Sequence, residues 1–561
     1  MFNRLDVSDN GNCWNAAMTS KKRSSPHVHP LWLSALTTLW LVTLPNWPLW
    51  RQLMALPEVQ GMRGVGFALG MGLAIWAVTH VLTLLLGWSA LLKPVLSLLV
   101  ISAAAGAYFM LSYGIVIDAT MITNVMQTDP REAADLLNWR MGLALLILAV
   151  LPLWLIWRTP LRTLSLGRTL VTQLGGIAVS ALVAVLCLMA IFQDFASIMR
   201  NHTQVRYLIN PLNSLYALGS VAAQPFQRDE TMILPIGQDA VLQRPANAKP
   251  PLIVLVLGET ARMGNFGING YERPTTPALA REKVVSLRGV TSCGTSTAAS
   301  VPCMFSHLGR EDFDGRKHNY ENLLDVLQHA GLAVLWIDNQ AGCKGACDRI
   351  HSASTTELKV SPWCDDGECH DEVMLDKLGE RIAQLPTEQR AKGIVVVMHQ
   401  MGSHGPAYYK RTPTAFKKFQ PECQSNALQE CDRQQVINAF DNTILYTDHF
   451  LGQTIAWLKH QTQPAVMMYV SDHGESLGEN NIYLHGLPYR VAPEEQKRVP
   501  WITWMSDSYQ HQQGLPLECM RSKVAQPLSH DSYFHSVLGL ANVKTSLYQN
   551  DKDVYASCRR L

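Results

Sequence analysis

The segment Cys293-Gly-Thr-Ser-Thr-Ala-Ala-Ser-Val-Pro-Cys303 places a hydroxyl-rich turn between two cysteines. Thr297 lies at its centre, beside small residues and next to a pattern typical of a helix start. A threonine hydroxyl is a poor nucleophile unless its pKa is lowered, so it needs an activating group. Glu259, Asp472 and His473 supply carboxylate and imidazole ligands that suit Zn²⁺. The sequence therefore predicts a metal-activated threonine that carries a covalent intermediate.

Five short apolar runs alternate with helical patterns in the second half of the chain, which is typical of a parallel sheet covered on both faces. They lie at residues 252–258, 333–338, 394–400, 465–472 and 500–505. Ligands of such sheets bind where the strands end. Glu259 follows the first run, whereas Asp472 and His473 lie at the end of the fourth. We therefore expect them to meet at one edge of the sheet, where Thr297 completes a tetrahedral metal site.

The turn around Thr297 has two further features that suit phosphoryl chemistry. The start of the following helix would favour anionic phosphoryl oxygens, and Pro302 is compatible with a first helical turn. A bond between Cys293 and Cys303 would close a small loop, which is worth roughly 3 kcal/mol in the chain-entropy model. Such a bond would hold Thr297 in place.

The cysteines indicate an oxidising compartment for the second half of the chain. Of the twelve, ten lie after residue 193, mostly in closely spaced pairs. An even number at short spacings is typical of disulfides, and no C-x₂-C pair suggests a zinc ribbon. Proximity suggests the following pairs: Cys293–Cys303, Cys343–Cys347, Cys364–Cys369, Cys423–Cys431 and Cys519–Cys558.

Five apolar stretches near the N-terminus contain no Asp, Glu, Lys or Arg. They lie at residues 31–50, 65–88, 94–117, 142–157 and 169–193. Four reach the roughly 20 residues that a spanning helix needs, and tilt or bilayer thinning can accommodate the shorter fourth. Pro45 and Pro48 interrupt the end of the first. We predict a five-helix transmembrane domain over residues 31–200; buried core helices are the alternative.

Basic residues set the orientation of these spans. They precede the first span and lie in the second and fourth connections: Lys21, Lys22, Arg23, Lys93, Arg158, Arg162 and Arg168. The positive-inside rule places residues 1–30 in the cytoplasm and exports everything after about residue 193. Patterns at 121–138 and 206–221 predict helices lying at the outer surface, and residues 201–251 read as such a helix followed by a bridging linker. The net charge of +2 gives no reason to expect a nucleic-acid partner.

Four long strings carry a resemblance to a known family. They are LGETARMGNFGINGYERPTTP, CGTSTAASVPCMFSHLG, MHQMGSHGPAYYKR and YVSDHGESLGENNIYLHGLPY. The chain resembles the phosphoethanolamine–lipid A transferases of Gram-negative bacteria, including the mobile colistin-resistance enzymes. The resemblance implies a five-helix membrane domain followed by a catalytic domain of the alkaline phosphatase/sulfatase type over residues 252–561.

The resemblance also assigns roles to residues of this chain. It implies that Thr297 is the nucleophile and that the zinc ligands are Glu259, Thr297, Asp472 and His473. Residues that match second-metal or phosphate-contacting positions are Lys344, His404 and His485. The polar set that would help to bind the donor lipid is Asn124, Thr128 and Glu132. Lys344 is bracketed by Cys343 and Cys347, where some family members have serine and no cysteines.

The implied reaction moves phosphoethanolamine from phosphatidylethanolamine to a phosphate of lipid A through a phosphothreonine. The resemblance implies one zinc ion and leaves room for a second. We expect a monomeric, multi-pass protein of the bacterial inner membrane with its catalytic domain in the periplasm. The added ammonium makes the outer surface less negative, so that polymyxins such as colistin lose electrostatic attraction.

Three alternative hypotheses about the function remain. A related enzyme would modify core sugars (Kdo or heptose) or transfer phosphoglycerol with the same metal and threonine. A hydrolase would release the phosphothreonine to water, and fold analogy alone does not decide between transfer and hydrolysis. A membrane sensor without activity would lack at least one ligand of the metal site.

Overall fold

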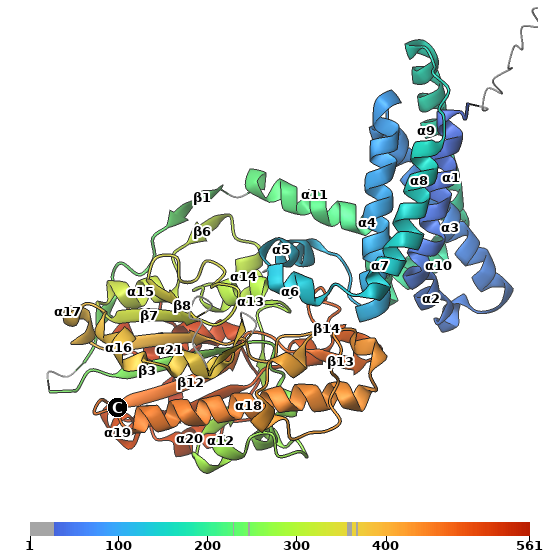
Figure 1. Cartoon of the computed structure of the whole chain (residues 1–561). Coiled ribbons are helices and arrows are strands. Elements are labelled where there is room, and N and C mark those ends of the chain that lie inside the picture. The colour runs from blue at the N-terminus through green and yellow to red at the C-terminus, as the bar shows by residue number, and fades with distance from the viewer. Residues whose placement is uncertain are drawn as a thin grey trace, which may run out of the picture.

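The computed structural model describes residues 27–128, 130–227, 229–244, 247–355, 362–365 and 368–560. A bundle of helices stands beside an α/β part, and shorter helices lie between the two (Figure 1). The bundle contains α1 (Pro30–Val42), α2 (Trp47–Met54), α3 (Gly61–Leu86), α4 (Leu92–Tyr113), α7 (Trp139–Leu145), α8 (Leu151–Arg158) and α9 (Leu166–Ala190).

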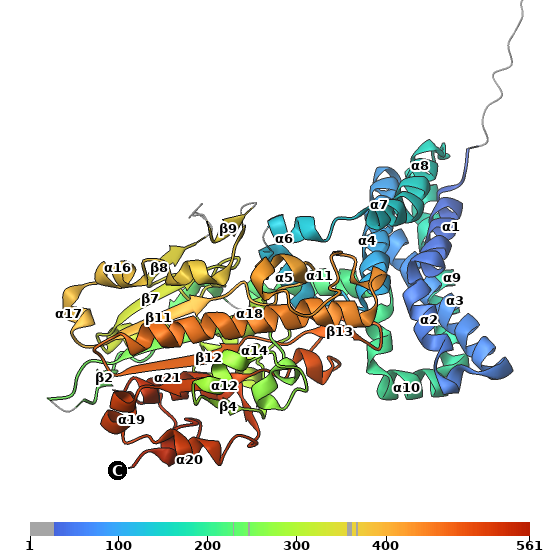
Figure 2. The same ribbon diagram turned by 60° about the horizontal axis from the view of Figure 1, so that its bottom comes forward.

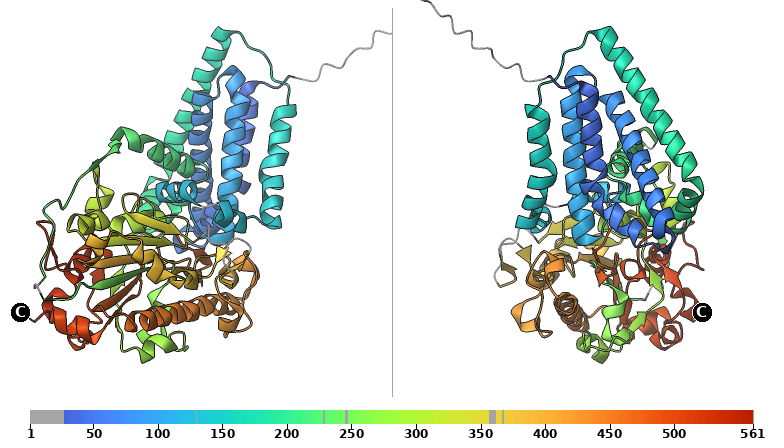
Figure 3. Two further views of the ribbon diagram at one scale, coloured as in Figure 1. Left: turned by 60° about the vertical axis from the view of Figure 1, so that its left-hand side comes forward. Right: turned by 90° about the vertical axis from the view of Figure 1, so that its right-hand side faces the viewer.

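Four helical segments of the described chain are long and apolar enough to cross a membrane. They are Gly61–Leu86, Ser89–Tyr113, Trp139–Arg158 and Leu166–Ala190. Figure 3 shows these helices running side by side as the bundle. Four of the predicted spans therefore correspond to helices of spanning length, and the count of five is not confirmed.

The predicted first span is broken. Helix α1 ends at Val42, and Pro45 follows in a short 3₁₀ turn, because proline cannot continue the backbone hydrogen-bond pattern of an α-helix. Its 13 residues extend for about 20 Å, less than the roughly 30 Å hydrocarbon core. Helix α1 nevertheless belongs to the bundle, because His80 of α3 lies 2.9 Å from Ser34 Oγ of α1 and 2.9 Å from Ser180 Oγ of α9.

Four shorter helices lie outside the long helices of the bundle. They are α5 (Ala119–Gln127), α6 (Pro130–Asp135), α10 (Phe192–Asn201) and α11 (Leu212–Gln227). Helices α5, α6 and α11 lie between the bundle and the α/β part, whereas α10 packs against the bundle (Figure 1). The single helix predicted over 121–138 is therefore two helices. Thr128 is extended, with φ −73° and ψ 136°, and Pro130 begins α6, as proline favours a first helical position.

A seven-stranded sheet forms the centre of the α/β part, in the order β4-β15-β12-β3-β11-β7-β8. Its strands are β3 (Leu252–Gly258), β4 (Val285–Leu287), β7 (Ala333–Asp338), β8 (His351–Ser354), β11 (Ile394–His399), β12 (Ala465–Ser471) and β15 (Trp501–Met505). The register pairs Ser471 with Gly258 and His399 with Asp338. The carboxyl ends of β12, β3, β11 and β7 therefore meet at one edge.

One strand contradicts the prediction of a parallel sheet. Strand β15 runs antiparallel to both β12 and β4. A parallel return requires a crossover, usually a helix, and the chain between β12 and β15 contains instead the hairpin of β13 (Ser476–Glu479) and β14 (Ile482–Leu484). The connection therefore returns the chain antiparallel and places the hairpin near the site edge.

Helices cover both faces of the sheet (Figure 2). One face packs against α13 (Thr297–Met304), α15 (Leu323–His329) and α21 (Tyr533–Leu540), and the other against α12 (Pro277–Arg281), α16 (Leu378–Ala383) and α18 (Arg433–Lys459). Strand β3 is buried along its whole length. A continuous apolar strand is what burial on both faces requires.

The predicted linker contains strands that dock onto the α/β part. Strand β1 (Asp229–Leu234) pairs with β6 (His318–Tyr320), and β2 (Val241–Leu242) pairs with β17 (Val543–Lys544). The remaining elements are β5 (Val290–Thr291), β9 (Cys364–Asp365), β10 (Glu368–Cys369), β16 (Leu528–Ser529), α14 (Arg310–Asp314), α17 (Thr387–Arg390), α19 (Asp507–Gln513) and α20 (Leu517–Arg521).

Candidate active site

The four residues expected to form the metal site lie together at the carboxyl edge of the sheet. Thr297 Oγ1 lies 3.0 Å from Glu259 Oε2 and 3.4 Å from His473 Nε2. His473 Nε2 lies 3.4 Å from both Glu259 Oε1 and Asp472 Oδ2. All four residues are buried. The structure therefore brings into contact residues that are separated by more than 200 positions.

The donor atoms of this cluster suit a metal ion. Asp472 Oδ2 is buried and has no hydrogen-bond partner, while Oδ1 accepts from the Thr260 and His473 amides. His473 Nδ1 lies 2.9 Å from the Gly474 carbonyl, which holds its proton there and turns Nε2 toward the carboxylates. The ligand atoms of Glu259, Asp472 and His473 lie within 4.8 Å of one another, a spacing that fits Zn²⁺.

The electrostatics of the cluster also favour a cation. Burial lowers the pKa of His473, but the charges of Asp472 and Glu259 outweigh burial and raise it to about 10. Burial, followed by the charge of Glu259, raises the pKa of Asp472. The pKa of Glu259 is lowered despite its burial, because His473 donates to it and carries positive charge. Two buried carboxylates thus draw a positive charge into the site, which a divalent ion supplies fully.

Gln340, which the sequence analysis did not single out, contacts Glu259 together with Thr260 and His399, which lie at the ends of two predicted strands. Gln340 Nε2 donates to Oε2 at 3.1 Å, and Thr260 Oγ1 donates to Oε1 at 2.5 Å. His399 Nε2 lies 3.9 Å from Oε2, while its Nδ1 lies 2.8 Å from Asp338 Oδ1. The available signal was the polar end of the second predicted strand, Asp338-Asn339-Gln340.

Helix α13 begins at Thr297 itself. The nucleophile candidate therefore lies in the first turn, where free backbone N–H groups favour an anion. Pro302 lies inside the helix and not in its first turn as expected. Ser300 Oγ donates to the Asp472 carbonyl at 2.6 Å, so the nucleophile helix is tied directly to the metal-ligand strand.

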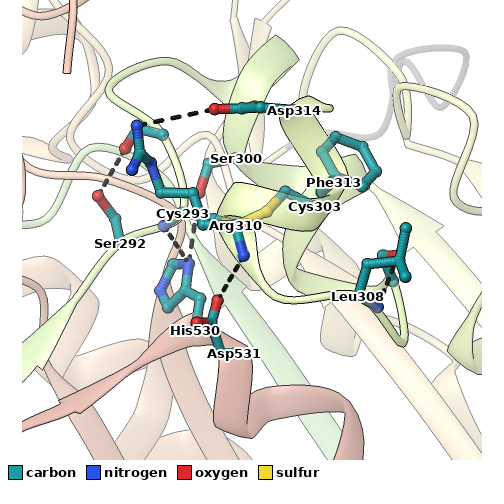
Figure 4. Close-up of a disulfide and its surroundings, with 12 residues drawn as sticks. Ser292, Cys293, Ser300, Cys303, Leu308, Arg310, Phe313, Asp314, His530 and Asp531 are labelled. Carbon is teal, nitrogen blue, oxygen red and sulfur yellow. Dashed lines mark hydrogen bonds and ion pairs between the residues drawn. A yellow bond between two sulfur atoms is a disulfide. The ribbon is translucent and has the colours of Figure 1, made fainter. Parts of the chain in front are cut away.

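The loop before Thr297 is closed by the Cys293–Cys303 disulfide (Figure 4). His530 supports this loop, because its Nδ1 accepts from the Cys293 amide at 3.1 Å and lies 3.3 Å from Ser300 Oγ. Burial lowers the pKa of His530 to about 3, so the ring is neutral and can accept. His530 lies far along the chain, and its sequence surroundings carried no signal.

His404 and His485 border the cluster of candidate metal ligands formed by Glu259, Thr297, Asp472 and His473, called the metal cluster below. The His485 ring centroid lies 4.3 Å from that of His473 and 5.9 Å from that of His404. His485 Nδ1 is 3.3 Å from Glu475 Oε1. The two rings therefore face the cluster from the hairpin and from the loop after β11, next to where a phosphoryl group on Thr297 would lie.

Lys344 lies at the boundary with the outer helices. Its Nζ donates to the Gln127 carbonyl of α5 and to the Ala341 carbonyl, each at 3.0 Å. It lines a cavity of about 440 Å³ that also contacts Gln340. Lys344 thus lies between α5 and the loop that contains Gln340, the residue that donates to Glu259. Its ammonium contacts backbone carbonyls of both.

The expected donor-lipid residues lie on α5 and α6. Asn124 and Thr128 are half-buried, and Thr128 Oγ1 donates to the Asn124 carbonyl at 2.7 Å. Glu132 belongs to α6, but its side chain lies outside the described part of the structure. Met121 of α5 packs against Gly486, next to His485. Helix α5 therefore covers the edge of the site.

All five expected disulfides are present. Among the cysteines of the described residues, only Cys187 is free. Cys343 and Cys347 form one of the bridges, directly around Lys344. The loop of Lys344 is therefore closed covalently.

The donor set leads to a prediction about metal content. Purified protein should bind about one zinc ion, and His473→Ala or Asp472→Asn should lower the bound zinc to roughly a tenth, because a tetrahedral site loses a ligand. Elemental analysis after dialysis measures this without any activity assay. His351→Ala, which replaces an exposed histidine of β8, is the control. Equal zinc in all variants would contradict the assignment.

The two bridges Cys293–Cys303 and Cys519–Cys558 predict different outcomes when each is replaced by two serines. In the chain-entropy model, the first bridge stabilises the folded state by about 3 kcal/mol, and the second, which closes a longer loop, by about 4 kcal/mol. Only the first adjoins Thr297, so only its loss should slow the reaction of the folded enzyme, by about ten-fold. Thermal unfolding and transfer rates measured on both variants test this; equal rates would contradict it.

Two family models match the chain. One is described as Sulfatase and matches residues 251–543. The other is described as Phosphoethanolamine transferase EptA/EptB and matches residues 75–226. The α/β part is therefore of the alkaline phosphatase/sulfatase type, and the helical part matches the membrane region of the transferases.

Relatives cover nearly the whole chain. Phosphoethanolamine transferase EptA of Salmonella typhimurium is 38% identical over 94% of this chain and 97% of its own length. Phosphatidylethanolamine transferase Mcr-1 of Escherichia coli is 40% identical over 78% of this chain and 83% of its own. The solved integral membrane protein lipooligosaccharide phosphoethanolamine transferase A of Neisseria meningitidis superposes with a TM-score of 0.91 at 35% identity, covering 96% of this chain and all of that one.

Proposed function

This chain belongs to the phosphoethanolamine transferase family, and from that premise we propose that it transfers phosphoethanolamine from phosphatidylethanolamine to a phosphate of lipid A. That it is an enzyme transferring phosphoethanolamine follows from the family. The name of the Neisseria relative, a lipooligosaccharide transferase, favours an acceptor that contains lipid A. The proposed mechanism rests on the contact of Thr297 Oγ1 with Glu259 and His473 at the start of α13.

In the first step, Thr297 Oγ1 attacks the phosphorus of the donor lipid. The new Oγ–P bond replaces the bond from phosphorus to diacylglycerol, which leaves as the alcohol. The Thr297 hydroxyl donates to Glu259 at 3.0 Å, so its proton faces a carboxylate while the oxygen is free to attack. Zinc bound by Glu259, Asp472 and His473 would supply charge stabilisation to the threonine oxygen.

The chain itself provides the surroundings for the phosphoryl oxygens. The first turn of α13 directs N–H groups at them, and His404 and His485 face the same space. Lys344 would exchange a backbone carbonyl for the lipid phosphate, because its ammonium lies at the boundary with α5. Groups placed in advance around developing charge are a main source of catalysis.

In the second step, a lipid A phosphate oxygen attacks the phosphothreonine and releases Thr297. The product gains a primary ammonium for each group transferred, so the surface becomes less negative. Cationic peptides such as polymyxins then lose electrostatic attraction. We therefore propose that the enzyme gives polymyxin resistance, in keeping with its similarity to Mcr-1.

We propose that this chemistry takes place in the periplasm. Lys93 and Arg158 to Arg168 lie at one end of the bundle, and α9 leaves from the other end. Val28, just before α1, pairs with Leu161 in the same basic connection, so α1 starts from the cytoplasmic side. We propose that α1 with the turn after it is a fifth, short crossing, and that the divisions at residues 30, 200 and 251 separate cytoplasmic segment, membrane domain, linker and catalytic domain.

Mass spectrometry of lipid A from a Gram-negative host tests the proposal. Cells expressing the intact chain should show lipid A with an added phosphoethanolamine, and cells expressing Thr297→Ala should not. A phosphoethanolamine on core sugars, or a phosphoglycerol increment, would replace the proposed acceptor or donor. Release of free phosphoethanolamine without modified lipid would identify a hydrolase.

A further inference from the structure

A buried charged cluster joins helix α6 to the α/β part. Asp135, the last residue of α6, is only 7% exposed. Its Oδ1 lies 2.6 Å from Lys410 Nζ, and its Oδ2 lies 3.3 Å from Arg411 Nη2. Asn426 Nδ2 donates to the Asp135 carbonyl at 2.8 Å. The end of α6 is thus held by side chains of the catalytic part.

The same guanidinium touches the loop that carries His404. Arg411 Nε donates to the His404 carbonyl at 3.0 Å, and Nη1 pairs with Glu368 Oε2. The Arg411 side chain is 1% exposed. A guanidinium is planar and its donors form a rigid fork. Any rotation that changes its hydrogen bond to one partner therefore changes its contacts with the others.

A continuous set of contacts leads from α6 to the metal cluster. Asp135 orients Arg411, Arg411 holds the backbone of His404, and the His404 ring lies beside His485. The His485 ring in turn lies 4.3 Å from His473. Helix α6, which contains Glu132, directly follows α5, which contains Asn124.

We propose that Asp135 and Arg411 are positioning residues, which set His404 against the phosphoryl group only when α6 is docked on the catalytic part. This inference rests on the proposed function, since it is the transferred phosphoryl group that His404 faces. Docking of the lipid-facing helices and completion of the active site are then one event. The arrangement would restrict the reaction to a donor presented at the membrane.

The charges of this cluster explain why loss of Asp135 would change the position of His404. Asp135 and Glu368 balance Lys410 and Arg411, so the cluster is neutral. Removing Asp135 leaves two cations beside one carboxylate, and the buried guanidinium of Arg411 can then turn toward Glu368, the carboxylate that remains. The His404 backbone then loses a fixed donor, and a misplacement of about 1 Å can cost ~10²-fold in rate.

The test uses full-length protein in lipid nanodiscs with fluorescent phosphatidylethanolamine and purified lipid A. Asp135→Ala and Arg411→Lys should each lower kcat by about 10- to 100-fold while KM for the donor stays within about three-fold, because His404 acts on the transition state. Asp135→Glu should restore part of the rate. The control is Arg140→Ala, which breaks an ion pair of 2.7 Å with Glu430 across the same boundary and should change kcat by less than about two-fold.

A second measurement separates positioning from general weakening of the fold. In a His404→Ala background, Asp135→Ala should slow transfer by less than about three-fold, because coupled residues are not additive. The same multiplicative loss in both backgrounds, or a loss no larger than that of Arg140→Ala, would overturn the inference. Absence of transfer by the unmodified protein would instead contradict the proposed function.

Discussion

Replacing Thr297 by alanine is expected to reduce phosphoethanolamine transfer by a factor of ~10⁴ or more, because removing a covalent nucleophile typically costs ~10⁴–10⁶ in kcat. The hydroxyl contacts Glu259 and His473 and lies in the first turn of α13. Transfer rates measured with purified variants and fluorescent donor lipid test this expectation directly.

Thr297→Ser is the matched control for this prediction. It keeps the attacking oxygen and loses only a methyl group, so we expect at least about a hundredth of the original rate to remain, with the loss arising from a freer rotamer. Without acceptor, a phosphoethanolamine adduct should appear on the peptide containing residue 297 in the original protein and in the serine variant. Transfer by Thr297→Ala within ten-fold of the original rate would show that another residue is the nucleophile.

Cutting the chain before β1 is expected to abolish transfer to lipid A while keeping cleavage of a small soluble phosphoethanolamine ester. The catalytic part retains one hydrophobic core entirely, and it loses from the other only four buried residues, Tyr108, Tyr113, Ile115 and Met121. It also retains all five disulfides and the cluster of candidate metal ligands. It loses α5 and α6, and with them the partner of Lys344 and the carboxylate of Asp135. The donor phosphorus lies at the membrane interface, so the isolated part can no longer reach it in the right orientation.

Paired assays make this second prediction decisive. Activity on the soluble ester measures whether the catalytic part is folded and metal-loaded, and lipid A modification measures coupling to the bilayer. We expect the first to fall by about 10- to 100-fold, which is the loss expected for Asp135→Ala alone, and the second to fall below detection. Transfer to lipid A at the full-length rate by residues 229–561 would contradict it.

The sheet and the meeting of the candidate metal ligands at its edge were predictable because both depend on local sequence. A fully buried strand has an uninterrupted apolar sequence. The predicted runs 252–258 and 333–338 have the same bounds as β3 and β7. Residues directly after parallel strands must lie at one edge, so Glu259, Asp472 and His473 could be brought together without a structure. Gln340 follows the same rule, because it lies two residues after β7, but an amide side chain is not a usual zinc ligand and so did not by itself indicate a metal site.

Other features depended on connections and neighbours that local patterns do not encode. The direction of β15 followed from a hairpin in the preceding connection. The first apolar stretch divided at Pro45, although its composition is that of a span. His530 supports the nucleophile loop from a position 237 residues away, and nothing near it in the sequence indicated that role.

The sequence by itself determined the residue types of the candidate site, which are a hydroxyl together with carboxylates and an imidazole at strand ends. It also determined the division into an apolar helical half and a catalytic half with five disulfides. Residue type and period are local properties, and they survive without knowledge of packing. Only the tertiary structure decided how the halves are joined. Lys344 contacts a carbonyl 217 residues away and Asp135 meets Arg411 276 residues away, and such pairs form only when the α/β part and the outer helices pack into one fixed arrangement.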